Sequence, residues 1–181
     1  MKPVYSNPKG HHIHSPFAFE LVSGVIFRSV NKAEKDLQKM WEKTNQNFQR
    51  LLLIHRLIEF FQPSAVWAPA GKKEMMELSV AGLPDINLRY FEGNPLPVLT
   101  FSNEWVIVDQ PVDMYGFEFV TNCNSVWFIE DLNHADQAGF FSSVKNHPKV
   151  SQTYALKNCG IVIFNPRYQK QDFMIRGRYP F

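Results

Sequence analysis

Three carboxylates follow two apolar segments that the sequence predicts to be buried strands. Asp109 follows the first segment, and Glu130 and Asp131 follow the second. Because ligands of open α/β sheets bind outside the carboxyl ends of the strands, these groups lie where chemistry is expected. Asp109, Glu130 and Asp131 are candidate ligands for a divalent cation such as Mg²⁺, which prefers oxygen ligands, and Asn133 could assist. The alternative is that they solvate the loops and cap the following helix.

Proton transfer is a second chemistry open to this region. His134 lies three residues after Asp131, and an imidazole near neutral pKa can act as a general base. We therefore predict Asp109, Asp131 and His134 as the catalytic residues of an active form of the domain.

Other histidines suggest structural functions. His11, His12 and His14 are close in sequence, and imidazoles at positions i and i+3 can converge on a metal ion. A short His-rich tract is only a compositional signal, however, and a local surface motif is the alternative. His55 lies on the apolar face of a predicted helix, which favours a buried histidine with a hydrogen-bond partner.

Composition limits the class of protein. The 181 residues are 45% hydrophobic, enough to bury one core, so we expect a single domain over residues 1–181. The 19 basic and 17 acidic residues are scattered along the chain, which argues against a nucleic-acid partner. We find no signal-peptide pattern and no apolar run of membrane-spanning length, so we expect a cytoplasmic protein without a membrane partner. Cys123 and Cys159 are too few and too far apart for a disulfide framework.

The N-terminal region, residues 1–62, is predicted to be helical. Ser15 and Pro16 form a typical helix start, and apolar residues recur at helical spacing to about Phe27. Asn31 with Glu34 imitates a capping box. The helix that follows is long, or is broken once near residues 45–47, and it must end before Pro63.

Residues 63–181 are predicted to form the sheet. Short apolar segments separated by turns are typical of buried parallel strands, and they occupy residues 65–68, 88–91, 105–108 and 125–129. Asn133 can cap a helix whose Ala135, Ala138, Phe141 and Val144 share a face. The last strands, 150–156 and 161–164, flank a loop of hairpin length in which Gly160 is available for a positive φ. The fold class is therefore a Rossmann-like α/β sheet, mostly parallel, with a C-terminal antiparallel hairpin.

The chain resembles a small bacterial branch of the class I S-adenosylmethionine-dependent methyltransferases. The resemblance rests on the segments KGHHIHSPFAFELVSGVIF, FQRLLLIHRLIEFFQPSAVW, SVWFIEDLNH, KNHPKV and GIVIF, which together cover about two-thirds of the chain. It implies the same fold, with S-adenosylmethionine bound at the carboxyl ends of the first two sheet strands. In that case Gly71 and Glu92 would bind the cofactor, with Glu92 placed against the ribose hydroxyls. The alternative for Glu92 is an ordinary turn residue.

Several positions depart from the family pattern. The family has an acidic residue and a glycine-rich turn after its first strand, but this chain has Ala68, Pro69 and a single glycine, Gly71. Lys72 and Lys73 would add positive charge beside a cofactor that already carries a sulfonium. The interval between Pro95 and Trp105 is also too short for the helix and strand that the family inserts there, so we expect a sheet reduced by about one edge strand and one helix.

Two hypotheses follow. In the first, the domain has lost S-adenosylmethionine binding and catalysis, has no cofactor, and acts as a pseudoenzyme or binding domain for a protein or small molecule. In the second, it is a divergent S-adenosylmethionine-dependent methyltransferase, with or without a divalent metal, acting on a small molecule. The reduced sheet would leave an exposed edge strand, which could pair two copies into a homodimer.

Overall fold

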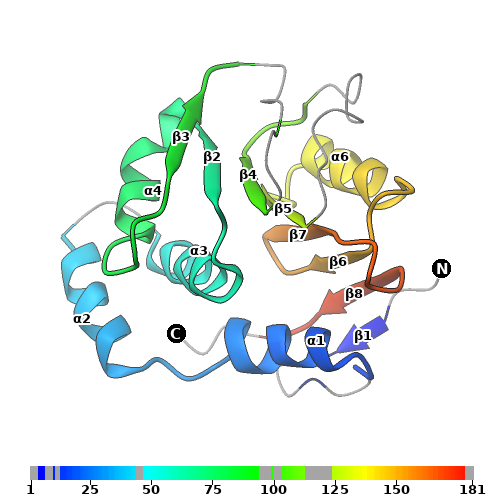
Figure 1. The fold of residues 1–181 in the computed structure, drawn as a ribbon, viewed down its shortest axis with the longest axis horizontal. Coiled ribbons are helices and arrows are strands. Elements are labelled where there is room, and N and C mark those ends of the chain that lie inside the picture. Colours follow the sequence, from blue (N-terminus) through cyan, green and yellow to red (C-terminus); the bar gives the residue numbers. More distant parts are fainter. Residues whose placement is uncertain are drawn as a thin grey trace.

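The computed structural model describes residues 4–6, 10, 13–43, 47–93, 99, 103–112 and 124–177. Its centre is an eight-stranded sheet with the order β1-β8-β6-β7-β5-β4-β2-β3 (Figure 1). The strands are β1 (Val4–Ser6), β2 (Ala65–Pro69), β3 (Leu88–Phe91), β4 (Glu104–Val108), β5 (Ser125–Glu130), β6 (Gln152–Ala155), β7 (Cys159–Phe164) and β8 (Gln171–Ile175).

The pairing confirms the predicted fold class. β2 is parallel to β3 and to β4, and β4 is parallel to β5. β7 is antiparallel to β5 and to β6, which gives the expected C-terminal hairpin. β3 stands at one edge of the described sheet, and β4 follows it along the chain with no described helix or strand in between.

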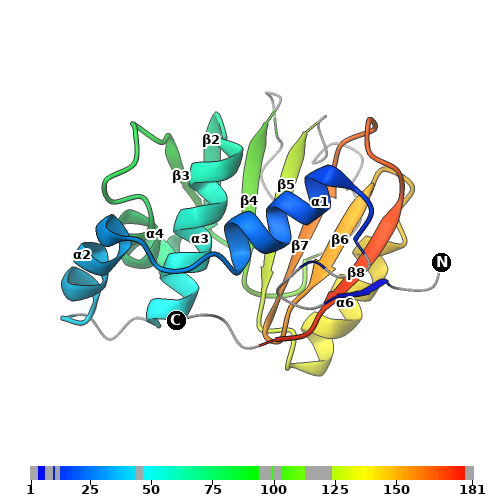
Figure 2. The ribbon, with the colours of Figure 1, turned by 90° about the horizontal axis from the view of Figure 1, so that it is seen from below.

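Helices cover both faces of the sheet (Figures 1 and 2). The larger core packs the sheet against an N-terminal group of helices, whereas the smaller core packs the other face against α6. The helices are α1 (Pro16–Phe19), η1 (Glu20–Ile26), α2 (Lys32–Trp41), α3 (Phe48–Phe61), η2 (Ala70–Lys72), α4 (Lys73–Ser79) and α6 (Ala135–Lys145).

The predicted helix starts are largely confirmed. The Ser15 side chain accepts a hydrogen bond from the Ala18 N–H, with Pro16 in the first turn. Asn31 and Glu34 form both hydrogen bonds of a capping box at the start of α2. The helical region is indeed broken before Asn47, and α3 ends at Phe61, because Gln62 adopts a left-handed conformation just before Pro63.

A buried arginine attaches the N-terminal helices to α3. The Arg56 side chain is fully buried and donates to both Glu34 carboxylate oxygens, at 2.7 and 2.9 Å. It also donates to the backbone carbonyl of Arg28 at 2.9 Å. Arg28 in turn pairs with Glu34 at 2.8 Å and with Glu59 at 2.7 Å. The end of η1, the start of α2 and the middle of α3 are therefore held by one ionic cluster.

The first helix runs from Pro16 to Ile26, close to its predicted end near Phe27, and its second part is the π-helix η1. Two expectations for α6 were wrong. The N-cap of α6 is His134, not Asn133, whose side chain instead donates to Asn158 at 3.1 Å. The buried face of α6 contains Gln137, Phe140, Phe141 and Val144, whereas Ala135 and Ala138 are exposed.

Gly160 is not the loop glycine with a positive φ that the sequence predicted. It lies within β7, and its φ is not among the positive values. A Cβ atom at this position would lie 2.4 Å from Phe141 Cε2. Glycine is needed here because the ring of Phe141 packs directly on the strand backbone.

Two strands were not predicted. β1 lies in the N-terminal region that the sequence indicated to be helical, and it pairs in parallel with β8, which extends the sheet beyond β6.

Among the residues that the structure describes, none of the helices has the length and apolar character needed to cross a membrane.

Candidate functional site at the carboxyl edge of the sheet

The ends of four neighbouring strands define the candidate site. Pro69 of β2 is in register with Phe91 of β3, so the segments that follow these strands start side by side. β4 lies next to β2, and β5 lies next to β4. The residues predicted from the sequence, Gly71, Glu92 and the strand-end carboxylates, therefore all follow adjacent strands at one edge.

The turn after β2 is compact and helical. β2 passes directly into the short 3₁₀ segment η2, and α4 begins one residue later. Gly71 does not have a positive φ, and a Cβ atom there would meet nothing within 4 Å. Unlike the glycines of a cofactor-binding turn, Gly71 is thus not required by the backbone conformation or by a close neighbour.

Lys72 in this turn reaches across the sheet to β5. Its Nζ lies 2.9 Å from Oε2 of Glu130, the last residue of β5. The Glu130 side chain is 0% exposed, and that of Lys72 is 25% exposed. Neither Glu130 oxygen accepts a hydrogen bond of good geometry, so the attraction depends on charge rather than on directional bonding.

Arg50 from the first turns of α3 completes an ionic cluster. Its Nη1 lies 3.5 Å from Glu130 Oε1, and its Nη2 donates to Asp131 Oδ1 at 2.8 Å. Asp131 has a φ of 56°, in the left-handed region, directly after β5. Two basic side chains, Arg50 and Lys72, thus face two carboxylates, and we call these four residues the edge cluster.

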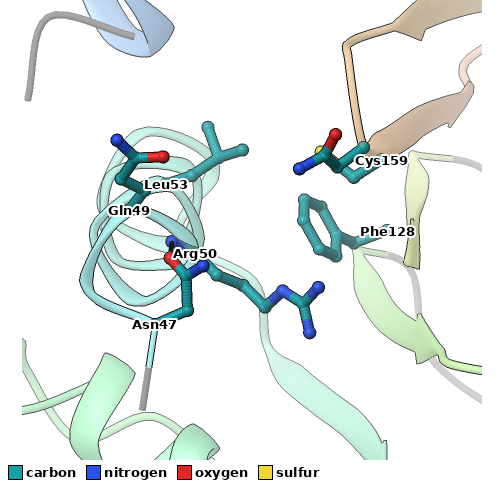
Figure 3. Close-up of a pocket in the computed structure, with 7 residues that line it drawn as sticks. Asn47, Gln49, Arg50, Leu53, Phe128 and Cys159 are labelled. Carbon is teal, nitrogen blue, oxygen red and sulfur yellow. Dashed lines mark hydrogen bonds between the residues drawn. The ribbon is translucent and has the colours of Figure 1, made fainter. Parts of the chain in front are cut away.

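A small pocket lies beside the edge cluster (Figure 3). It has a volume of about 40 Å³ and lies between α3 and the strands β5 and β7. Arg50 extends from α3 toward Phe128, and Cys159 lies on the same side of the pocket as Phe128 (Figure 3). Pockets for small organic ligands usually measure about 300–1,000 Å³. This pocket can hold a few water molecules, but it is too small for a nucleoside.

The predicted metal ligands do not form a metal site in the described part of the chain. Glu130 and Asp131 are each engaged by a basic side chain, and Asp109 is half-buried directly after β4. Across the described ranges, no group of three or more His, Cys, Asp or Glu residues is arranged to hold a metal ion. The arrangement gives the metal hypothesis no support.

The predicted base, His134, is also placed differently from the expectation. Its backbone N–H donates to the Asp131 carbonyl at 2.9 Å, and its side chain is exposed. The Asp131 carboxylate is instead paired with Arg50. His134 and Asp131 are thus joined by a backbone hydrogen bond in the turn before α6.

The other histidines singled out in the sequence analysis fall into three groups. His55 is buried, and its Nδ1 lies 2.9 Å from the Ser79 carbonyl, as expected for a core histidine. His14 is exposed just before the Ser15 cap. His11 and His12 lie outside the described residues, as does Cys123.

The sequence analysis missed the basic partners of the carboxylates. Arg50 and Arg56 both lie on α3, whose residues 51–58 are all buried. A charged residue within or beside a nearly continuous apolar helix needs a partner, because burying an unpaired charge is costly. That signal indicates a paired arginine but not the identity of its partner, since Arg50 and Asp131 are 81 residues apart in sequence.

No protein-family model matches the chain, and neither does any curated protein. The resemblance to methyltransferases therefore rests on the quoted sequence segments and on the fold class.

Proposed function

We propose that this chain is a methyltransferase-like domain that has lost S-adenosylmethionine binding and catalysis and that it acts by binding a partner. The main support is the ion pair between Lys72 and Glu130. In an open α/β sheet the ligand crevice lies at the carboxyl ends of the strands, where the connections diverge to opposite faces. Lys72 follows β2 and Glu130 ends β5, with β4 between them. The ion pair therefore lies across the strand ends at which such sheets form their ligand crevice.

Charge argues against the cofactor at the same place. S-adenosylmethionine carries a positive sulfonium, and the residue at the family's acidic position is Ala68, which is fully buried. Two of the three strand-end carboxylates, Glu130 and Asp131, are already paired with Lys72 and Arg50. A bound sulfonium would share this edge with the two basic side chains, and Glu130 and Asp131 are already engaged as their counter-charges.

Titration calorimetry with S-adenosylmethionine and S-adenosylhomocysteine tests the proposal. We expect no heat of binding for either ligand up to about 1 mM, a dissociation constant that corresponds to roughly −4 kcal/mol. Micromolar binding, about −8 kcal/mol, would overturn the proposal, since it would show that the altered turn still forms a site.

One observation favours the alternative of a divergent methyltransferase. Glu92 is exposed directly after β3, and Gly93 follows with a φ of 66°. β3 is adjacent to β2, and a carboxylate after this strand supports a ribose-binding role for Glu92. In this alternative Glu92→Ala would weaken S-adenosylhomocysteine binding at least tenfold, about 1.4 kcal/mol, whereas unchanged affinity would remove the support from Glu92.

A further inference from the structure

The opposite edge of the sheet carries an aromatic depression. Phe60 and Phe61 end α3, Phe17 is the second residue of α1, and Tyr168 lies in the connection between β7 and β8. All four rings are half-buried, and they line a depression of about 200 Å³. The rings of Phe17 and Tyr168 are stacked, with centroids 4.4 Å apart and an interplanar angle of 20°. Phe17 and Tyr168 thus cover one face of each other, and the aromatic cluster lines the depression with its remaining ring surface.

Three asparagines add polar groups to the same depression. Asn103 precedes β4, Asn124 precedes β5 and Asn165 follows the antiparallel strand β7, so all three lie at the amino edge of the parallel strands. Asn103 and Asn124 have left-handed backbones, with φ of 66° and 70°. No acidic or basic side chain lines this depression, so it suits a neutral ring that has hydrogen-bonding edges.

The amide groups of these asparagines retain hydrogen-bonding capacity. Asn103 Nδ2 donates to the Gln62 carbonyl at 2.9 Å, which fixes the amide and leaves its oxygen as an acceptor. Asn165 Oδ1 accepts from the Arg167 N–H at 3.0 Å, which leaves its NH₂ group as a donor. The side chain of Asn124 forms no hydrogen bond within the described part of the chain. Paired donors and acceptors of this kind match the edges of nucleobases.

A second, polar depression of about 310 Å³ adjoins the first at Tyr168. It is lined by His14, Arg167 and several glutamines, and no carboxylate is among its lining residues. The guanidinium of Arg167 is exposed and forms no ion pair or hydrogen bond in the described part of the chain. Arg167 and Tyr168 are adjacent in sequence and both line this second depression, so Arg167 lies close to the junction. Guanidinium groups bind phosphate in a bidentate manner.

We propose that these two adjoining depressions bind a mononucleotide, with the base against the aromatic rings and the phosphate beside Arg167. The aromatic depression, about 200 Å³, is smaller than the usual ligand pocket of about 300–1,000 Å³, and the polar depression, about 310 Å³, is at the lower limit of that range. Their combined volume lies within the range. The site is at the opposite edge of the sheet from the edge cluster and does not depend on the proposed loss of S-adenosylmethionine binding.

The test is a titration of the full chain, followed by ¹⁵N NMR, with AMP, GMP, CMP and UMP, with the matching nucleosides and with inorganic phosphate. We expect at least one mononucleotide to bind with a dissociation constant below about 1 mM. It should shift the side-chain amide resonances of Asn103, Asn124 and Asn165. The matching nucleoside should bind about tenfold more weakly, because it lacks the phosphate.

Three variants separate the two halves of the site. Arg167→Gln should remove the tenfold advantage of the nucleotide over its nucleoside, whereas Lys35→Gln, which removes an exposed lysine on α2, should leave that advantage intact. Tyr168→Leu should weaken nucleotide and nucleoside alike. Asn124→Gly is the second test of this half of the site, for use if Tyr168→Leu does not fold. It keeps the left-handed backbone, removes one side-chain amide, and should weaken the binding of nucleotide and nucleoside alike.

The proposal is overturned if no mononucleotide binds at about 5 mM, or if binding is the same in Arg167→Gln and Asn124→Gly as in the unaltered chain. It is also overturned if the shifted resonances belong to Ala68–Lys72 instead of the three asparagines. Those shifts would indicate a nucleotide at the carboxyl edge and would count against the proposed function instead.

Discussion

Lys72 Nζ lies 2.9 Å from Glu130 Oε2, although the two residues follow strands that are separated by β4. Glu130 is fully buried, and its second oxygen lies 3.5 Å from Arg50. Removing either basic partner should lower the stability of the fold, because the buried carboxylate would keep its charge away from water with less compensation. The edge cluster therefore connects the turn after β2, the end of β5 and the start of α3 at the carboxyl edge.

Two adjacent lysines allow a matched test of this connection. We expect Lys72→Met to lower the free energy of unfolding by about 2 kcal/mol, below the cost of breaking a fully buried pair because Lys72 is partly exposed. Lys73 is 64% exposed, and its pairing distance to Glu77 is 3.9 Å, so Lys73→Met should change stability by less than about 0.5 kcal/mol. Urea denaturation of both variants measures the difference, and equal effects would contradict the account.

Stability at low pH should depend on Glu34. Burial raises the pKa of this carboxyl, but hydrogen bonds from Arg56, Arg28 and the Asn31 N–H outweigh burial and lower the pKa from 4.5 to about 2. A carboxyl with a lowered pKa stabilises the fold above its unfolded-state pKa, and this contribution is lost as pH falls through the folded-state value. We expect about 3 kcal/mol from this source at neutral pH.

The measurement is urea denaturation of Glu34→Gln and of the unaltered chain between neutral pH and about pH 2. The variant should be less stable at neutral pH, and the difference should shrink below about pH 4.5. Glu59→Gln is the control, because Glu59 also pairs with Arg28 but its side chain is 46% exposed. A Glu34→Gln difference that does not vary with pH would show that the Glu34 charge contributes nothing.

Two glycines should respond to alanine in opposite directions. Gly160→Ala places a Cβ atom 2.4 Å from the Phe141 ring, so we expect a loss of about 2 kcal/mol from overpacking. Gly139 lies in α6 with no atom near its added Cβ, and Gly139→Ala should stabilise by roughly 0.5–1 kcal/mol, because alanine favours helices. Thermal denaturation of both variants checks the pair, and a stable Gly160→Ala variant would show that Phe141 moves freely.

Self-association is expected through β3. This strand pairs only with β2 in the described part of the chain and stands at the edge of the sheet. Exposed edge strands pair readily with further strands. Light scattering during gel filtration should give twice the mass of one chain. A single chain mass at every concentration would exclude the homodimer.

Local sequence patterns predicted much of the fold. The Ser15 cap, the capping box of Asn31 and Glu34 and the end of α3 before Pro63 all depend on neighbouring residues, and all are confirmed. The central strands were also predicted, since their near-continuous apolar character reflects burial on both faces.

Contacts between distant residues could not be predicted. The Arg50–Asp131 pair depends on how α3 packs over β5, and no local pattern encodes that geometry. The same applies to the Gly160–Phe141 contact and to β1, a short strand that pairs only because β8 offers an edge. For the candidate site, the sequence indicated the carboxylates and the unusual turn but not the ion pairs that connect them.

The central claim is that the carboxyl edge no longer binds S-adenosylmethionine. The most direct measurement is ¹⁵N NMR of the full chain with S-adenosylhomocysteine, in which the backbone amides of Ala68, Ala70, Gly71, Lys72, Glu92 and Glu130 are followed. The account predicts that these resonances do not move at about 1 mM ligand. Saturable shifts of Gly71, Lys72 and Glu92 would contradict it and would establish a cofactor site at this edge.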